Sequence, residues 1–345
     1  QLLESDKDNK VVVFKFTGPG NNSQHYQSAL DNASMKYKLI STSEDKHTPA
    51  QLATLITESL YSVVIVEITG YPDPTYLTDR LSLLNGYHLF VDDVQTVIRY
   101  DATAEMWTVL INKLLELSAD KNVWIACDFA QAWFVTDTRS IVTVANVIID
   151  ILKPIQRATL SRNLRNTFDL SSILSVIRDQ FVNLFSLKLD ILDLVLPTQS
   201  PGHFIHGPLT VMHVFNDCNV ADIVRVFNIE LVRLCDVHDI GIVYTGYSND
   251  VMPLVEDSVK KRCDNTGSKI AVCSSMSCYS AQWPAVIVLY SEEEQDLTAL
   301  YLMLSRARVY CSVFIYPWEG ATLDDIPYMS PLLDKLSNHV RIIRH

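Results

Sequence analysis

Short apolar runs typical of β-strands alternate with helix-like segments along nearly the whole chain, and this alternation constrains the fold more than any other feature. In the first half the strand-like runs are residues 10–17, 37–40, 62–69, 89–91 and 122–126. Segments with helical spacing of apolar residues lie between them, and residues 107–117 are one example. Alternation at this spacing predicts parallel sheets with helices on both faces. We therefore expect an α/β protein with doubly wound, mainly parallel sheets.

The second half of the chain continues the pattern, and we expect Val309 to Tyr316 to be its final strand. A chain of 345 residues exceeds the size of most single hydrophobic cores, so two domains are expected. Pro154 follows an apolar, helix-like segment and marks the candidate boundary. We expect one domain over residues 1–154 and a second over residues 155–345.

Charge, hydropathy and cysteine usage exclude several classes of protein. A net charge of −12 argues against sequence-independent binding of nucleic acid by the whole surface, although a local basic groove stays open. No run of about 18 apolar residues occurs, so no transmembrane helix and no membrane partner are expected. The seven cysteines form no Cys-x-x-Cys pair, so neither a zinc site nor a disulfide framework is predicted. A reducing, intracellular location, cytoplasmic or nuclear, fits best.

The strand-like run Leu89–Val91 ends in two adjacent carboxylates, Asp92 and Asp93, and Gln95 follows two residues later. Acidic residues at the carboxyl end of such a strand lie where open α/β sheets bind their ligands. In nucleoside triphosphatases one such acid holds Mg²⁺, directly or through water, and its neighbour polarises the attacking water. The alternative interpretation is a strand that ends in a solvated Asp-Asp turn. The next strand also ends in polar residues, which include Asp128 and Gln131.

The order of these motifs resembles the superfamily 1 helicase core, which consists of two RecA-like domains of the phosphate-loop nucleoside triphosphatase type. Asp92-Asp93-Val94-Gln95 resembles the Asp-Glu-x-Gln motif, with Asp93 in place of Glu. The resemblance implies that Asp92 holds Mg²⁺ through water, that Asp93 activates water and that Gln95 contacts the nucleotide. Residues 124–131 resemble the Gly-Asp-x-x-Gln motif, which makes Gln131 the sensor of the γ-phosphate.

Two further motifs carry arginines in the second half. Residues 160–167 resemble the motif Leu-x-x-Asn-Tyr-Arg that opens the second domain, which implies that Arg165 reaches phosphate, with Arg162 as the alternative. Leu304-Ser305-Arg306-Ala307-Arg308 resembles Leu-Thr-Arg-Ala-[Arg/Lys], which implies that Arg306 acts as an arginine finger. The implied cofactors are ATP and Mg²⁺.

Within that superfamily the sequence is most similar to the C-terminal helicase-like domain of the Schlafen family. The likeness rests on residues 90–95 and 123–131, on the final Leu304–Arg308 motif, and on the loop Pro-Gly-His-Phe-Ile-His-Gly-Pro at residues 201–208. It implies recognition of single-stranded or structured nucleic acid, RNA or DNA, or a role in defence. We expect His203 and His206 of this loop to serve packing or loop hydrogen bonds rather than a metal.

The sequence departs from the helicase pattern at two places. It lacks a Gly-Lys-[Ser/Thr] phosphate loop, so either the chain starts after that loop or residues 18–24 are its decayed remnant. Tyr279-Ser280-Ala281-Gln282 also stands where helicases carry Lys-Gly-Leu-Glu.

Three hypotheses about function follow. The first is a helicase-like nucleotide-binding module, a possible ATP-dependent helicase or NTPase whose activity is weak or depends on an upstream phosphate loop. The second is a non-catalytic pseudo-helicase scaffold for protein partners. The third is an unrelated α/β hydrolase, for which no Gly-x-Ser-x-Gly elbow is found. In all three we expect Trp124, Trp133 and Trp283 to serve core or interdomain packing rather than base stacking.

Overall fold

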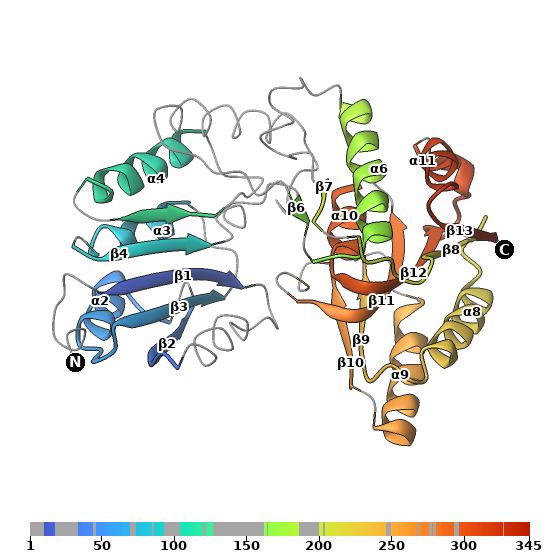
Figure 1. The fold of residues 1–345 in the computed structure, drawn as a ribbon, viewed down its shortest axis with the longest axis horizontal. Helices are drawn as coiled ribbons and strands as arrows, with labels where there is room; N and C mark the ends of the chain where they lie inside the picture. The colour runs from blue at the N-terminus through green and yellow to red at the C-terminus, as the bar shows by residue number, and fades with distance from the viewer. Residues whose placement is uncertain are drawn as a thin grey trace. The chain divides into compact units, whose positions relative to one another are not determined.

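The structure is a computed structural model, and it forms two compact units, Gln1–Arg157 and Ala158–His345 (Figure 1). Each unit is described by itself below. The structure describes residues 10–17, 34–43, 46–69, 74–84, 86–92, 104–119, 122–126, 162–163, 165–185, 200–202, 204–245, 250–267, 269–275, 278, 281–292, 297–326 and 328–345. The predicted boundary at Pro154 lies outside these ranges and stays a prediction.

The first unit is built on a five-stranded sheet whose described pairings are all parallel. The strand order is β2-β3-β1-β4-β5. The bounds are β1 (Val11–Thr17), β2 (Tyr37–Thr42), β3 (Val63–Thr69), β4 (His88–Asp92) and β5 (Val123–Ile125). These strands coincide closely with the apolar runs in the sequence, and the parallel α/β class is confirmed.

The described helices of this unit are α2 (Pro49–Thr57), α3 (Pro74–Leu81) and α4 (Ala104–Leu117), and α3 packs against both of the others. Thr48 caps α2 in a capping box with Gln51, and Pro49 follows in the first turn, where proline is favoured. The Nζ of buried Lys10 donates hydrogen bonds to the Ile56 and Ser59 carbonyls, at 3.1 and 2.7 Å. A cation at the carboxyl end of a helix is favoured, so Lys10 ties α2 to the start of β1.

One helix boundary in this unit was predicted wrongly. The sequence pattern predicts a helix over residues 76–84 with Gly86 as its cap, but α3 ends at Leu81 and a turn follows. Gly86 instead has a φ of 93° in the turn that leads into β4. A positive φ favours glycine in a turn as much as in a helix cap, so the residue type alone did not distinguish the two.

The second unit holds a six-stranded sheet in the order β10-β9-β11-β12-β8-β13, again with parallel pairings throughout the described part. The bounds are β8 (Val211–Val214), β9 (Asp239–Tyr244), β10 (Lys269–Ser274), β11 (Trp283–Glu292), β12 (Ala307–Pro317) and β13 (Arg341–Arg344). A separate two-stranded sheet pairs β6 (Arg162–Asn163) with β7 (Ser200–Pro201).

Helices cover both faces of the six-stranded sheet (Figure 1). α8 (Val220–Arg233) and α9 (Met252–Thr266) pack on the face that contains Ala285, Ile287 and Leu289 of β11. α6 (Phe168–Phe185) and α10 (Leu297–Leu304) contact β12 and each other, and α11 (Met329–Leu336) contacts α6. A short 3₁₀ helix, Leu323–Asp325, precedes α11. The central strands of the six-stranded sheet are buried on both faces. For this reason they appear in the sequence as unbroken apolar runs.

The prediction that Val309–Tyr316 is the final strand was wrong. α11 and then β13 follow it, and β13 pairs with β8 at the end of the sheet. β13 has the sequence Arg-Ile-Ile-Arg, and its two arginines are exposed. A four-residue strand at a sheet edge with charged ends has too little apolar content to be recognised from sequence.

Candidate functional site

In the first unit, β4 ends at Asp92, and this carboxylate is paired with a lysine from the neighbouring strand. Asp92 Oδ2 lies 2.9 Å from Lys15 Nζ, and the two side chains are 19% and 7% exposed. Lys15 and Asp92 are register partners in β1 and β4. Sequence reasoning missed Lys15. The available signal was a single lysine inside the apolar run Val-Val-Val-Phe-Lys-Phe.

The other predicted residues of this unit lie outside the described part of the chain. Asp93, Gln95 and Gln131 belong to this group, together with the glycine loop at residues 18–24. Their roles therefore stay predictions.

In the second unit, three segments that are far apart in the sequence meet at residues 305–308. Asn166 Nδ2 donates hydrogen bonds to the carbonyl oxygens of Ser305 and Ala307, at 3.3 and 2.5 Å. The backbone N–H of Thr167 donates to the Arg308 carbonyl at 3.2 Å, and that of Trp283 donates to the Arg306 carbonyl at 3.1 Å. The two predicted arginine motifs therefore lie against each other.

Arg306 is almost fully buried, with 1% of its surface exposed. Its Nε donates to the Leu302 carbonyl at 3.2 Å, and its Nη2 donates to Ser305 Oγ at 2.8 Å. Within the described residues no carboxylate forms an ion pair with it. A buried guanidinium whose partners are all neutral is costly on its own, and an anion would offset that cost.

The positive charge of Arg306 acts on two nearby thiols, those of Cys273 and Cys278. Burial raises the pKa of Cys278 to about 11 and that of Cys273 to about 12, and in both cases the positive charge of Arg306 reduces the increase. Both thiols therefore stay protonated at neutral pH, and neither supplies the negative charge that would neutralise Arg306.

Arg165 lies next to Asn166, and its side chain is exposed. Asn166 itself is buried, and its two hydrogen bonds fix the backbone of this segment to the Arg306 turn. The structure thus brings the Arg165 and Arg306 segments together in one unit.

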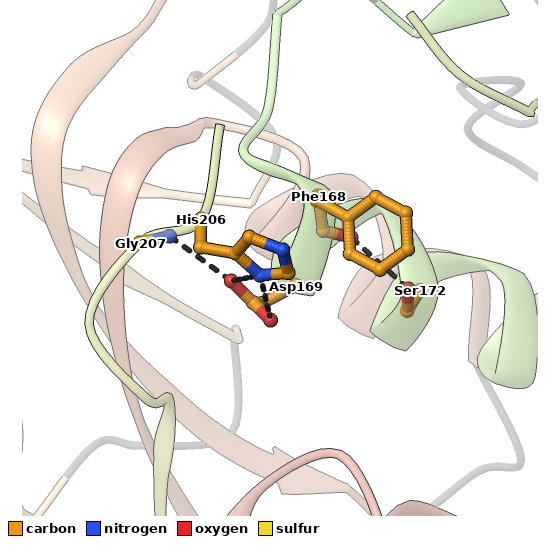
Figure 2. A network of polar contacts seen from close by, with 5 residues as sticks. All are labelled: Phe168, Asp169, Ser172, His206 and Gly207. Carbon is orange, nitrogen blue, oxygen red and sulfur yellow. Dashed lines mark hydrogen bonds and ion pairs between the residues drawn. The ribbon is translucent and has the colours of Figure 1, made fainter. Parts of the chain in front are cut away.

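Figure 2 shows a polar network at the start of α6, beside these segments. The Asp169 carboxylate accepts hydrogen bonds from the Gly207 backbone N–H at 3.0 Å and from His206 Nδ1 at 3.1 Å. Burial raises the pKa of Asp169, but these hydrogen bonds outweigh it and hold the pKa below its ordinary value. The expected role of His206 in loop hydrogen bonding is confirmed, whereas His203 lies outside the described residues.

Aromatic rings extend this network toward solvent. The ring of Phe168 lies 5.0 Å from that of His206 and stacks on Phe204 at 6.4 Å between centroids. Phe204 is 86% exposed. Sequence reasoning missed Phe168 and Asp169, because their partners Phe204 and His206 lie far away in the sequence.

The packing prediction for the tryptophans is confirmed for Trp283, which is buried and packs on Gly241 of β9. Trp124 is 66% exposed, so it does not lie in the core of the first unit, and its packing between domains stays a prediction. β5 is the last strand at one end of the described sheet, and for this reason its side chains have a neighbouring strand on one side only. Trp133 lies outside the described residues.

Among the described residues, no group of three or more His, Cys, Asp or Glu side chains is placed to hold a metal ion. Within the same ranges, no helix combines the length and the apolar character that crossing a membrane requires.

Comparisons with known proteins give only distant structural likenesses. No family model and no curated protein matches the sequence. The chain is similar to S. cerevisiae Dbp5 bound to RNA and ADP BeF3, with a TM-score of 0.43 and 10% identity over 100% of this chain and 80% of that one. It is also similar to Mycobacterium smegmatis helicase Lhr bound to ssDNA and AMP-PNP, with a TM-score of 0.47 and 12% identity over 99% of this chain. A third similar structure is the DUF1998 helicase MrfA bound to DNA, with a TM-score of 0.46, 10% identity and 98% coverage of this chain.

The chain spans 44% of the Lhr chain and 44% of the MrfA chain. At these scores and identities the likenesses do not assign a function, and the fold described above rests on the strand order and pairing of the chain itself.

Proposed function

We propose that the chain is a helicase-like nucleotide-binding module made of two RecA-like domains. The observation that carries the proposal is the buried Arg306, whose guanidinium has only neutral partners among the described residues and whose turn is bonded to the Arg165 segment. Two arginines on joined segments suit a ligand with several negative charges, and the phosphates of a nucleotide are such a ligand.

The residues present also fit the implied Mg²⁺, although Asp92 is already paired with Lys15. Mg²⁺ prefers oxygen ligands. The carboxylate of Asp92 at the end of β4 would hold the ion through a water molecule. The ammonium of Lys15 holds the same carboxylate, so the cation competes with it. When bound, Mg²⁺ neutralises phosphate charge, while Arg165 and Arg306 hold and orient the phosphates. Asp93 as base, Gln131 as sensor and Gln95 as nucleotide contact complete the proposed site.

ATP turnover in this proposal is weak or depends on a phosphate loop upstream of the chain. The absence of Gly-Lys-[Ser/Thr] from the sequence and the replacement at residues 279–282 support this part. The proposed setting is intracellular recognition of RNA or DNA, or defence, with Schlafen-family C-terminal domains as the proposed relatives.

A non-catalytic scaffold for protein partners is the second candidate. The observation that favours it is the ion pair between Lys15 and Asp92, because a carboxylate neutralised by a lysine does not need a metal. Exposed apolar side chains, among them Phe204 and Ile205, supply surface for a partner.

Titration calorimetry of ATP with Mg²⁺ tests the first candidate. We expect Arg306→Gln to weaken binding about tenfold or more, because it removes a charge from the phosphate site. Arg306→Lys should retain part of the affinity. Arg225→Gln removes an exposed arginine of α8 and is the control that should bind like the unchanged chain. Equal affinity of Arg306→Gln and the unchanged chain would contradict the role of Arg306.

A further inference from the structure

Three charged residues of the first unit form a row across neighbouring strands. Lys15 of β1 is the register partner of Glu67 in β3 and of Asp92 in β4. Register partners in a parallel sheet point to the same face, so the three side chains leave the sheet on one side. Two residues earlier in each strand, Val13, Ile65 and Phe90 pack in one apolar cluster, which confirms the common face.

The charges in this row do not balance. Glu67 is only 7% exposed, and its Oε1 has no hydrogen-bond partner among the residues that the structure describes. Lys15 contributes one positive charge between two carboxylates, and its ammonium bonds Asp92. A buried carboxylate oxygen without a partner is costly, so a protein rarely retains one that serves no purpose.

A second buried lysine, Lys10, directly precedes β1 and bonds backbone groups. Its Nζ donates hydrogen bonds to the carbonyls of Ile56, Thr57 and Ser59. Lys15 differs because it lies between two acids and is bonded to one of them.

We propose that Glu67 and Asp92 form a divalent-cation site that Lys15 keeps closed as an internal counter-ion. A hard dication such as Mg²⁺ or Mn²⁺ takes carboxylate oxygens as ligands and neutralises both acids, whereas the lysine neutralises one. Glu67 and Asp92 are two strand spacings apart, about 10 Å between Cα atoms. Their side chains and two metal–oxygen bonds of about 2–2.6 Å span that distance once the ammonium leaves.

The proposal deepens the proposed function, on which it rests for the role of Asp92 toward Mg²⁺. It adds Glu67 as a second carboxylate ligand and Lys15 as the group that sets the affinity. Cation binding to this row requires no nucleotide, so the two proposals can fail separately.

Mn²⁺ binding, followed by electron paramagnetic resonance on the whole chain without nucleotide, tests the proposal. We expect weak binding by the unchanged chain and binding tighter by about tenfold or more for Lys15→Met. The double variant Lys15→Met with Glu67→Gln should lose this gain. Lys38→Met, which removes an exposed lysine from β2 of the same sheet, is the matched control and should bind like the unchanged chain.

A thermal melt of the same variants gives a second readout. Lys15→Met removes the ammonium that pairs with Asp92 and is in register with Glu67, so Mn²⁺ should raise its melting temperature more than that of the unchanged chain. Unchanged Mn²⁺ affinity of a folded Lys15→Met, or a gain that survives Glu67→Gln, would overturn the proposal. If Lys15→Met does not fold, Glu67→Gln alone decides: weaker Mn²⁺ binding than the unchanged chain supports the site, and equal binding refutes it.

Discussion

Asn166 joins the two arginine-bearing segments of the second unit through one buried amide. Replacing it by alanine leaves the carbonyl oxygens of Ser305 and Ala307 without this donor. We expect Asn166→Ala to lower the free energy of unfolding by about 1–3 kcal/mol, which is the cost of unsatisfied buried polar groups. Urea unfolding measures the change. Asn228→Ala, at an exposed position of α8, should stay within about 0.5 kcal/mol of the unchanged chain.

Gly241 lets the Trp283 ring lie directly on β9. A Cβ at this position would lie 2.3 Å from Trp283 Cε3, so Gly241→Ala must push the ring away. Overpacking of this kind costs about 1–3 kcal/mol of stability. The double variant Gly241→Ala with Trp283→Leu should lose less than the sum of the two single changes, measured by urea unfolding followed by circular dichroism. Additive losses would show that the ring and the glycine are not in contact.

At the scale of single elements, α2 depends on its N-cap residue, Thr48. The Thr48 side chain accepts a hydrogen bond from the Gln51 backbone at 3.3 Å, and the Gln51 side chain accepts one from the Thr48 N–H at 2.9 Å. Loss of a cap of this type costs about 1 kcal/mol, so Thr48→Ala should lower the urea midpoint of the first unit. Thr54→Ala, six residues later on the exposed side of the same helix, is the control. A midpoint for Thr48→Ala equal to that of the control would exclude the capping role.

Three elements of the second unit, α8, β8 and β12, meet at the buried Glu230 of α8. Its carboxylate pairs with Arg233, accepts a hydrogen bond from Tyr310 of β12 at 3.1 Å and lies 3.3 Å from His213 of β8. His213 Nδ1 lies 3.0 Å from Nε2 of His345, which follows β13. Burial raises the pKa of Glu230, but these partners outweigh it and lower the pKa below 4.5. Burial, with the charge of His213, lowers the pKa of His345 below 6.5.

Both shifts make the second unit less stable in acid. A group whose pKa is lower in the folded state binds protons more readily when the chain is unfolded. Its contribution to the stability of the folded state is therefore complete above the unfolded pKa and is lost as the pH falls through the folded pKa. We expect the urea midpoint to fall first below about pH 6.5, through His345, and again below about pH 4.5, through Glu230. His345→Gln should flatten only the first decrease. An unchanged profile for His345→Gln, compared with the exposed control His238→Gln, would contradict this assignment.

At the scale of the whole molecule, the sequence predicted the fold better than the site. The apolar runs predicted most described strands because a parallel strand buried on both faces needs apolar residues throughout. Thr48-Pro49 and Asn219 are likewise residue types that favour the start of a helix, and α2 and α8 begin there. The edge strand β13 was not predicted because it is short and charged at both ends.

The contacts within the site could not be predicted in the same way. The pairing of Lys15 with Asp92 depends on strand register, and that of Asp169 with His206 joins residues 37 positions apart. Periodicity carries no information about either. Only the motif order in the second half of the chain pointed to the neighbouring Arg165 and Arg306 segments, which the hydrogen bonds of Asn166 hold together.

Binding of ATP with Mg²⁺, measured by calorimetry, tests the central proposal most directly. Two versions should be compared: the chain as given, and one extended upstream by about thirty residues, the length of a strand, phosphate loop and helix. We expect Mg²⁺-dependent binding by the extended version, weakened by Asp92→Ala. Absence of binding in both versions would contradict a nucleotide-binding module and would favour the scaffold for protein partners.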